Sequence, residues 1–200
     1  MPEEPRGLRE RKKLATRTAL AQAAWRLTIE QGYAHTRIED IAEAAGVSAR
    51  TFSNYFSGKD EALLSVGMDR GARMVAALRS CPADADLWEA LAYALSEQFA
   101  GNGEVPRDIA GRIAFPPELA AAQRRLHASI EAALATAIAE RTGTDVSKDL
   151  YPRLVAGVVV SATQTAFDHW RMSDRGLAFP ETLREVLRQI SQGLPPPPSV

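Results

Sequence analysis

Apolar residues recur along this chain at spacings of three and four, and no segment alternates apolar and polar residues with a period of two. Because a helix brings positions three and four apart onto one face, this spacing predicts helices almost everywhere. The pattern is interrupted where helices end or turn, at Gly32, Gly46, residues 101–106, Pro116 and Gly143. We therefore expect an all-α fold of about nine helices.

Composition bounds the class of protein. The chain has 200 residues, of which 46% are hydrophobic, enough to build a core. Its single cysteine, Cys81, cannot form an internal disulfide, which favours a reducing compartment. The first residues lack a secretory apolar segment, and the longest uncharged stretch, residues 154–167, is shorter than the roughly 20 residues of a membrane span. We expect a cytoplasmic protein that does not enter a membrane.

Residues 36–56 hold two short helical segments separated by a tight turn. Thr36 and Glu39 have the spacing of a capping box, which predicts that the first helix starts there. Gly46 suits the turn, and Ser48 is a good N-cap for a second helix over residues 49–55. Two short helices joined by a glycine-containing turn form a helix-turn-helix. In that motif the second helix lies in the major groove of DNA.

The outward face of the second helix carries side chains suited to DNA. The residues predicted to face inward are Val47, Phe52 and Phe56, and those predicted to face outward are Ala49, Arg50, Ser53 and Asn54. Arg50 can offer a bidentate fork to guanine, and Asn54 can do the same for adenine. The hydroxyls of Ser48 and Thr51 suit phosphate oxygens beside a helix N-terminus, and Lys59 follows close behind.

A basic segment precedes this motif. Residues 6–17 contain six Lys or Arg and one Glu, a net charge of +5, although the whole chain has a formal net charge of only -1. On its own such a run is more often a solvated helix face than a nucleic-acid contact. Its position before a helix-turn-helix indicates an arm that contacts phosphates beside the groove.

The spacing of these residues resembles that of the tetracycline-repressor-like (TetR) regulators. The resemblance covers about the first third of the chain and rests on Leu20, Ala23, Ala24, Leu27, Gly32-Tyr33, Thr36, Ile41-Ala42, Ala45-Gly46-Val47-Ser48, Thr51-Phe52, Tyr55-Phe56, Lys59, Glu61, Leu63 and Leu64. It implies a three-helix DNA-binding module over about residues 8–56 and a helical effector-binding and dimerisation domain over 57–194, with flexible tails at 1–7 and 195–200. It also implies DNA contacts at Thr36, Arg37, Ala49, Arg50, Thr51, Asn54, Tyr55 and Lys59.

Two positions depart from the family pattern. Ser53 stands where the family commonly has an aromatic residue that touches the DNA backbone, and Arg37 stands where a small hydroxyl residue is usual. The first change removes an expected phosphate contact, and the second replaces it with a charged one. The operator sequence therefore does not transfer from the family.

The segment Leu150–Trp170 is apolar on most of its circumference. Such a helix must be covered on several sides, which predicts that its own bundle covers one side and a second copy of the chain the other. The amphipathic segment over residues 180–194 is expected to share this homodimer interface. The predicted interface residues are Val155, Val159, Ala162, Ala166, Trp170, Leu187 and Ile190.

An effector pocket is expected among aromatic and polar residues of the C-terminal domain, because pockets in bundles are mostly apolar with a few placed polar groups. Each candidate has an alternative reading as ordinary core. Gln164 is the strongest candidate, since an amide in an apolar helix needs partners. The candidates are Trp88, Tyr93, Phe99, Phe115, His127, Gln164 and Phe167.

We expect a ligand-responsive regulator, a repressor that leaves a palindromic double-stranded DNA operator when a small apolar or amphipathic effector binds. His35, His127 and His169 are scattered without metal-ligand spacing, and no cofactor or catalytic motif is present, so neither a metal, a cofactor nor an enzymatic activity is expected. Two alternatives remain open. One is a helical enzyme or ligand carrier that keeps the hairpin as scaffold, and the other is a protein-interaction adapter whose basic arm meets an acidic partner.

Overall fold

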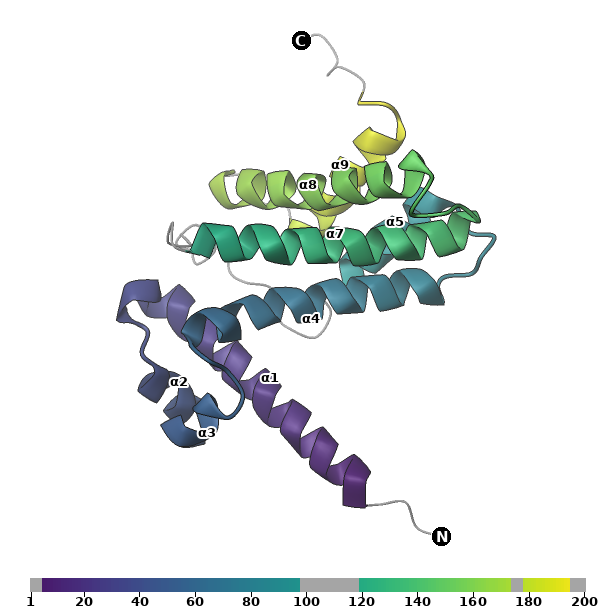
Figure 1. Ribbon diagram of the computed structural model, residues 1–200. Coiled ribbons are helices and arrows are strands. Elements are labelled where there is room, and N and C mark those ends of the chain that lie inside the picture. Colours follow the sequence, from purple (N-terminus) through teal and green to yellow (C-terminus); the bar gives the residue numbers. More distant parts are fainter. Residues whose placement is uncertain (1–4, 98–118, 174–177, 195–200) are drawn as a thin grey trace. The chain divides into compact units, whose positions relative to one another are not determined.

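The computed structural model describes residues 5–97, 119–173 and 178–194, and within these ranges all regular structure is helical (Figure 1). The predicted all-α class is confirmed. The elements are α1 (Pro5–Gln31), the 3-10 turn η1 (Tyr33–His35), α2 (Ile38–Ala44), α3 (Ala49–Ser53), α4 (Lys59–Ser80), α5 (Leu87–Glu97), α7 (Ala120–Thr142), α8 (Leu150–Met172) and α9 (Phe179–Ser191).

The chain divides into two compact units. The first holds the described part of Met1–Met68 and Arg112–Gln123, and the second holds the described part of Asp69–Gly111 and Arg124–Val200. Helices α4 and α7 each supply residues to both units. Helix α1 begins at Pro5, inside the segment expected as an N-terminal tail.

Helices α1, α2 and α3 share one core with the start of α4. Leu20 of α1, Ile41 of α2 and Phe52 of α3 are fully buried, and Leu63 of α4 is 2% exposed. Helix α3 has only five residues, far fewer than an isolated helix needs in water. Burial of the Phe52 ring in this shared core therefore fixes α3 on the other helices, and the ring also lies 5.6 Å, centroid to centroid, from that of Phe56.

The turn between α2 and α3 has the predicted chemistry. Gly46 has a φ of 69°, a left-handed conformation that glycine adopts without steric cost. The side-chain oxygen of Ser48 accepts a hydrogen bond from the backbone N–H of Thr51 at 3.1 Å, which caps α3. The second helix and its N-cap are confirmed.

The predicted capping box at Thr36 is wrong. The N-cap of α2 is Arg37, whose side chain makes no capping hydrogen bond, and Thr36 instead closes the turn η1. Gly32, with a φ of 85°, turns the chain after α1, and the Thr36 hydroxyl donates to the Gly32 carbonyl at 2.9 Å. Because this bond uses the hydroxyl and buries it, Thr36 is not available to cap α2.

The second unit is a bundle in which α7 lies between α4 and α8 (Figure 1). Its core includes Leu78 of α4, Leu91 of α5, Leu134 and Ile138 of α7, and Val159 of α8. Helix α9 packs against α5 and α8. The bundle therefore covers one face of α7 and one face of α8 with apolar contacts from the other helices.

Two arginines form hydrogen bonds that connect α7 with α4 and with the segment between α4 and α5. Arg79 of α4 donates to both carboxylate oxygens of Glu140 on α7, at 2.8 and 2.9 Å. Arg141 donates to the carbonyls of Pro82 and Ala85 at 2.6 and 2.7 Å, which holds the connection between α4 and α5 against α7. Exposed ion pairs add little stability, so the main effect of these bonds is on geometry.

The residues predicted for the dimer interface lie mostly inside the protomer. Val159 is fully buried, Ala166 is 1% exposed and Leu187 is 3% exposed, and they pack within the bundle. Val155 and Trp170 are also buried, while Ala162 and Ile190 are half-buried. The prediction took the most apolar face of α8 for an interface, but that face is apolar because α7 and α9 cover it.

None of the helices in the described ranges has a stretch long and apolar enough to cross a membrane. Within the same ranges, His, Cys, Asp and Glu side chains nowhere gather in a group of three or more that could hold a metal ion.

Candidate functional site

Helix α3 presents a polar face opposite its buried phenylalanine. Arg50, Ser53 and Asn54 are exposed, while Ala49 and Thr51 are half-buried at the first turn. Three of the four residues predicted to face outward are thus exposed, and the fourth, Ala49, is half-buried. The Ser53 hydroxyl donates to the carbonyl of Ala49 at 3.2 Å, so it lies along the helix. Arg50 and Asn54 are therefore the longest polar side chains on this exposed face.

The start of α3 gathers hydroxyls and backbone N–H groups. The side-chain oxygens of Ser48 and Thr51 lie 2.9 Å apart, next to the N–H groups of the first helical turn. A phosphate oxygen can accept hydrogen bonds from both kinds of donor. The two residues that were predicted as phosphate contacts therefore lie together.

A groove lies between the starts of α2 and α4. It has a volume of about 820 Å³ and is lined by Thr36, Arg37, Ile38, Glu39, Ser57, Gly58, Lys59, Asp60 and Glu61. Arg37 is exposed on its rim. Hydrogen bonds from the backbone and side chain of Ser57 hold the pKa of Glu61 below its usual value. The carboxylate of Glu61 thus stays charged and caps the backbone at the start of α4.

Lys59 fastens the first turn of α4 to the turn after α1. Its ammonium donates to the carbonyls of Tyr33 and Thr36 at 2.7 and 3.0 Å, and lies 4.0 Å from the centroid of the Tyr33 ring. The Tyr33 hydroxyl in turn donates to the carboxylate of Asp60. Sequence reasoning treated Lys59 only as a phosphate contact and did not find this clamp. The Tyr33 and Lys59 pair was its only available signal.

Thr36 and Tyr55, expected as DNA contacts from the family resemblance, are less available than the α3 residues. Thr36 is 1% exposed, and its hydroxyl donates a hydrogen bond to the carbonyl of Gly32. The DNA contact expected of the Thr36 side chain is therefore wrong, because this side chain is buried within the first unit. Tyr55 is half-buried and packs against the core of the first unit.

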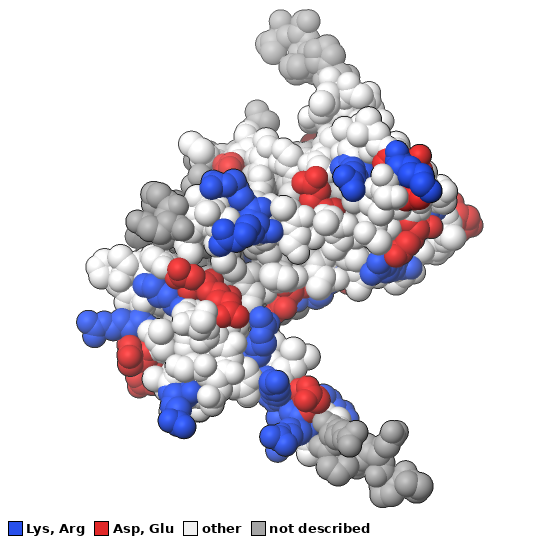
Figure 2. Space-filling model, viewed as in Figure 1, with Lys and Arg blue, Asp and Glu red and all other residues white. Residues whose placement is uncertain are grey.

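Basic side chains gather on the described start of α1 (Figure 2). Arg9, Arg11, Lys12 and Lys13 are all exposed there. Arg17, the last basic residue of this segment, differs because its guanidinium lies 5.0 Å from the centroid of the Phe56 ring. Arg17 therefore supports the core of the first unit as well as adding positive charge.

In the second unit, two of the predicted pocket residues meet. Gln164 of α8 contacts the imidazole of His127 on α7, with its amide nitrogen 3.1 Å from Nε2 and also close to Nδ1. Burial lowers the pKa of His127, which favours the neutral imidazole. A neutral imidazole can accept a hydrogen bond from the amide of Gln164. His127 is therefore the hydrogen-bond partner that this amide was expected to need.

The predicted aromatic residues do not form one cluster. Phe167 lies with its ring centroid 5.5 Å from that of Phe179, which is 5.3 Å from Trp170. Trp88 packs separately against the main core, and Tyr93 is 48% exposed on α5. Phe99 and Phe115 lie outside the described residues.

Sequence reasoning missed a pair of arginines on α4. Arg70 and Arg73 lie three residues apart and are half-buried, and the Nε atom of each is buried. Burial and the nearby positive charge of Arg73 lower the pKa of Arg70 to about 10. The available signal was the spacing of two arginines next to the apolar positions Met74 and Val75.

Comparison with known proteins gives matches over both halves of the chain. Residues 20–66 match the family described as bacterial regulatory proteins, tetR family. Residues 107–195 match the family described as the MftR C-terminal domain. The first match contains α2, α3 and all nine residues that line the groove.

One relative and two solved structures are similar over most of the chain. The HTH-type transcriptional regulator TcmR of Streptomyces glaucescens is 31% identical over 82% of this chain and 76% of its own length. The fatty acid degradation regulator FadR from Bacillus halodurans has a TM-score of 0.60 at 20% identity, over 90% of this chain and 96% of that one. Thermus thermophilus FadR, solved in complex with lauroyl-CoA, has a TM-score of 0.57 at 23% identity, over 92% and 98%.

Proposed function

Because this chain belongs to the tetR family of bacterial regulatory proteins, we propose that it is a repressor that binds a palindromic DNA operator as a homodimer and is released by a small effector. The observation that carries the DNA-binding part is the capped helix α3, with Arg50 and Asn54 exposed on the face opposite Phe52. The effector is held by the second unit.

Base recognition is assigned to two side chains of α3. Arg50 offers two parallel N–H donors to the O6 and N7 acceptors of a guanine, and Asn54 offers a donor and an acceptor to an adenine. Ala49, at the first turn, leaves room for a base edge or a thymine methyl group close to the helix. Because position 53 carries serine in place of an aromatic residue, one contact to the DNA backbone is missing. Charged side chains are therefore expected to supply a larger share of the phosphate contacts.

Phosphate contacts surround this reading helix. Ser48 and Thr51 contribute hydroxyls beside the N–H groups of α3, and Arg37 contributes a guanidinium at the rim of the groove. The exposed basic residues of α1 extend the contact along the backbone. Lys59 remains a proposed contact, although two carbonyls already accept hydrogen bonds from its ammonium, so at most one of its three N–H donors is left for a phosphate.

The dimer is proposed to form on the exposed face of α8. Leu150 and Leu154, one turn apart at the start of α8, are 74% and 55% exposed, and Met172 at the other end of the helix is 78% exposed, all on the side away from Val159. Large apolar residues in such numbers on one helix face are a feature of association sites. This assignment replaces the buried residues of the sequence prediction.

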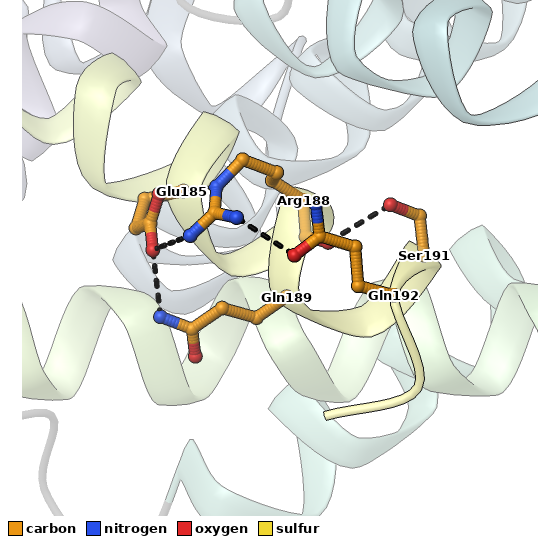
Figure 3. A network of polar contacts seen from close by, with 5 residues as sticks. All are labelled: Glu185, Arg188, Gln189, Ser191 and Gln192. Carbon is orange, nitrogen blue, oxygen red and sulfur yellow. Dashed lines mark hydrogen bonds and ion pairs between the residues drawn. The ribbon is translucent and has the colours of Figure 1, made fainter. Parts of the chain in front are cut away.

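The outer face of α9 carries an ordered polar network (Figure 3). Arg188 donates to both carboxylate oxygens of Glu185, at 2.6 and 2.8 Å, and to the amide oxygen of Gln192 at 2.7 Å. Gln189 donates to Glu185 at 2.8 Å. Side chains already held in one arrangement lose less conformational freedom when a partner covers them, so this face suits the polar edge of the same interface.

The effector is proposed to act through α4, which supplies residues to both units. The recognition helices of a dimer must reach successive major grooves, about 34 to 36 Å apart for adjacent half-sites. A ligand that favours another position of α4 changes this separation and weakens operator binding. The hydrogen bond and the cation–π contact between Lys59 of α4 and Tyr33 of η1 couple such a shift directly to η1 and, through it, to α2.

The test is selection of bound sequences from random duplex DNA, followed by titrations at several salt concentrations. We expect a two-fold symmetric sequence and an affinity that falls steeply with salt, because each neutralised phosphate releases counterions. Arg50→Ala is expected to lose about 1 to 3 kcal/mol of discrimination at one base step in each half-site. Ser53→Ala on the same face is the matched control. Salt-insensitive binding or no enriched sequence would refute the proposal.

The dimer face is tested separately by sedimentation. Leu154→Glu is expected to give monomers, because it places a charge in the proposed apolar contact. Tyr93→Glu, at a similarly exposed position on α5, should leave the association state unchanged. Dimers of Leu154→Glu as stable as those of the parent would show that another face is used.

A further inference from the structure

Arg17 differs from the other basic residues at the start of α1 in what surrounds it. This part of the helix extends beyond α2 and α3 in Figure 1, and residues 7–15 are exposed. Arg17 is half-buried, and Leu20, one turn further along, is fully buried in the core of the first unit. Arg17 therefore lies where the projecting part of α1 enters that core.

The guanidinium of Arg17 contacts the segment that follows the reading helix. It lies 5.0 Å from the centroid of the Phe56 ring, which is 2% exposed. The backbone N–H groups of Tyr55 and Phe56 both donate to the carbonyl of Phe52, at 2.9 and 3.0 Å, and so close the turn after α3. Because the face of an aromatic ring attracts a cation, this contact attaches α1 to the turn in which α3 ends.

The charge of Arg17 also acts on the start of α4. Hydrogen bonds of 2.8 Å from the backbone N–H and the hydroxyl of Ser57 are the main cause of the low pKa of Glu61, and the positive charge of Arg17 lowers this pKa further. Glu61 is thus a charged carboxylate that holds the segment between α3 and α4 and interacts with Arg17. Arg17 takes part in at least one other interaction within the chain. Its guanidinium is therefore engaged inside the first unit.

We propose that Arg17 is a positioning residue for base recognition, whose guanidinium, on the ring of Phe56, sets the direction in which α3 presents its reading side chains. It acts through this ring and not through a DNA phosphate, although its place in the basic segment predicts a phosphate contact. Arginine suits this position, because a planar guanidinium can stack on a ring and a compact ammonium cannot. The inference rests on the proposed function, since it concerns how α3 reads DNA.

Arg17→Lys keeps the charge and removes the guanidinium plane. Its affinity is measured for the duplex selected from random DNA and for a scrambled duplex, each at several salt concentrations. We expect the selected duplex to bind about threefold to tenfold more weakly, because a misdirected α3 loses base contacts, while the affinity for the scrambled duplex and the salt slope stay unchanged. Affinity for the selected duplex equal to that of the parent would overturn the proposal, because a phosphate accepts either cation.

Arg17→Gln and its matched control, Lys13→Gln, each remove one positive charge from the same side of α1, four residues apart. Lys13 is exposed, so its variant should bind both duplexes equally more weakly and reduce the salt slope by about 0.9. Arg17→Gln should lower the ratio of the two affinities by about tenfold, whereas a loss of stability alone reduces both affinities alike. If Arg17→Gln leaves this ratio unchanged, the proposal is wrong.

Hydrogen exchange without DNA tests the contact with Phe56 directly. The amides of Tyr55 and Phe56 should exchange about fivefold faster in Arg17→Gln, because the turn that they close is no longer held on α1. The same amides should exchange at the parental rate in Lys13→Gln. Circular dichroism shows that both variants are folded under these conditions. Exchange at the parental rate in Arg17→Gln would refute the anchor on Phe56.

The same preparations separate this role of Arg17 from the proposed function. If the parent selects no sequence and binds DNA without salt dependence, the proposed function is wrong and the reading role of Arg17 with it. Faster exchange in Arg17→Gln would then still establish the anchor on Phe56. If the parent selects a symmetric sequence but Arg17→Gln and Lys13→Gln change its binding alike, only the role of Arg17 is wrong.

Discussion

The two helices of the reading motif and the two central helices of the second unit are held in place by different means. Helices α2 and α3 have seven and five residues, whereas α7 and α8 have 23 each. The short helices depend on a glycine in a left-handed conformation and a capping hydroxyl, together with one buried ring. The long helices depend on apolar side chains distributed along their length. A few individual residues therefore set the geometry of the first region, whereas many apolar contacts along the helices set that of the second.

The largest expected effect is at the ring that anchors the short helix. Phe52→Ala should lower the free energy of unfolding by about 3 to 5 kcal/mol, because it leaves a cavity in a small core. Urea unfolding measures the loss, and hydrogen exchange shows whether it is confined to the first unit. Tyr93→Ala, an exposed aromatic position, serves as control. A loss in Phe52→Ala no larger than in this control would show that α3 has other anchors.

Volume is tested at the close approach of α4 and α7. Gly71→Ala should destabilise the second unit by about 1 to 3 kcal/mol, because the added Cβ would stand 2.7 Å from Cγ1 of Ile130 and displace that side chain or the helix that carries it. Gly157→Ala on α8 is the matched control, since its Cβ would meet ordinary contact distances of 3.5 Å. That control should be stabilising by about 0.5 to 1 kcal/mol through helix propensity. Thermal unfolding that ranks the two variants the other way would contradict this picture of the bundle.

The capping hydroxyl gives a smaller effect. Ser48→Ala should cost about 1 kcal/mol, because the backbone N–H of Thr51 loses its acceptor. Because fraying of α3 displaces the reading helix itself, we expect the loss of DNA-binding free energy to exceed the loss of unfolding free energy. Titration with operator DNA measures the first, and titration with urea measures the second. Ser53→Ala removes a hydroxyl from the same helix that caps nothing. If Ser48→Ala and Ser53→Ala lowered stability and DNA affinity equally, the cap at Ser48 would contribute no more than an ordinary surface hydroxyl.

The smallest effect is expected on the exposed face of α9. Hydrogen bonds from Arg188 and Gln189 lower the pKa of Glu185 to about 2, from an ordinary value of 4.5. A depressed carboxyl pKa stabilises the folded state above the ordinary value and loses that contribution as pH falls through the folded one. The melting temperature of Glu185→Gln should therefore differ slightly from the parent at pH 6, and the difference should shrink between about pH 4.5 and 2. A difference independent of pH would mean that the pair contributes through packing.

The first unit was largely predictable because its determinants are local. Gly46 and Ser48 act within a few residues of their own position, and the place of Phe52 between exposed positions of a short helix marks it as inward-facing, so a single sequence shows their roles. Thr36 was the exception. Its spacing to Glu39 fits a cap, but Gly32 turns the chain earlier, and the hydroxyl closes that turn instead. The clamp between Lys59 and Tyr33 joins residues 26 apart and has no local pattern.

The second unit was predictable in fold and less so in its sites. Periodicity identifies α8 as apolar on most sides, but it does not say which side meets α7 and which meets solvent. Val155 and Val159 were therefore assigned to an interface although their own bundle buries them. The meeting of His127 with Gln164 depends on how α7 and α8 are aligned, which no spacing within either helix fixes.

The brevity of α3 limits how much sequence one protomer distinguishes. With five residues, the helix carries room for about two side chains that each discriminate a base by about 1 to 3 kcal/mol. A genome offers on the order of 10⁶ to 10⁹ competing sites, and a discrimination of this size leaves most of the protein spread over them. Pairing two protomers on a symmetric site doubles the number of bases read in one binding event. With so short a reading helix, the protein thus needs a dimer to select one site among the competing sites of a genome.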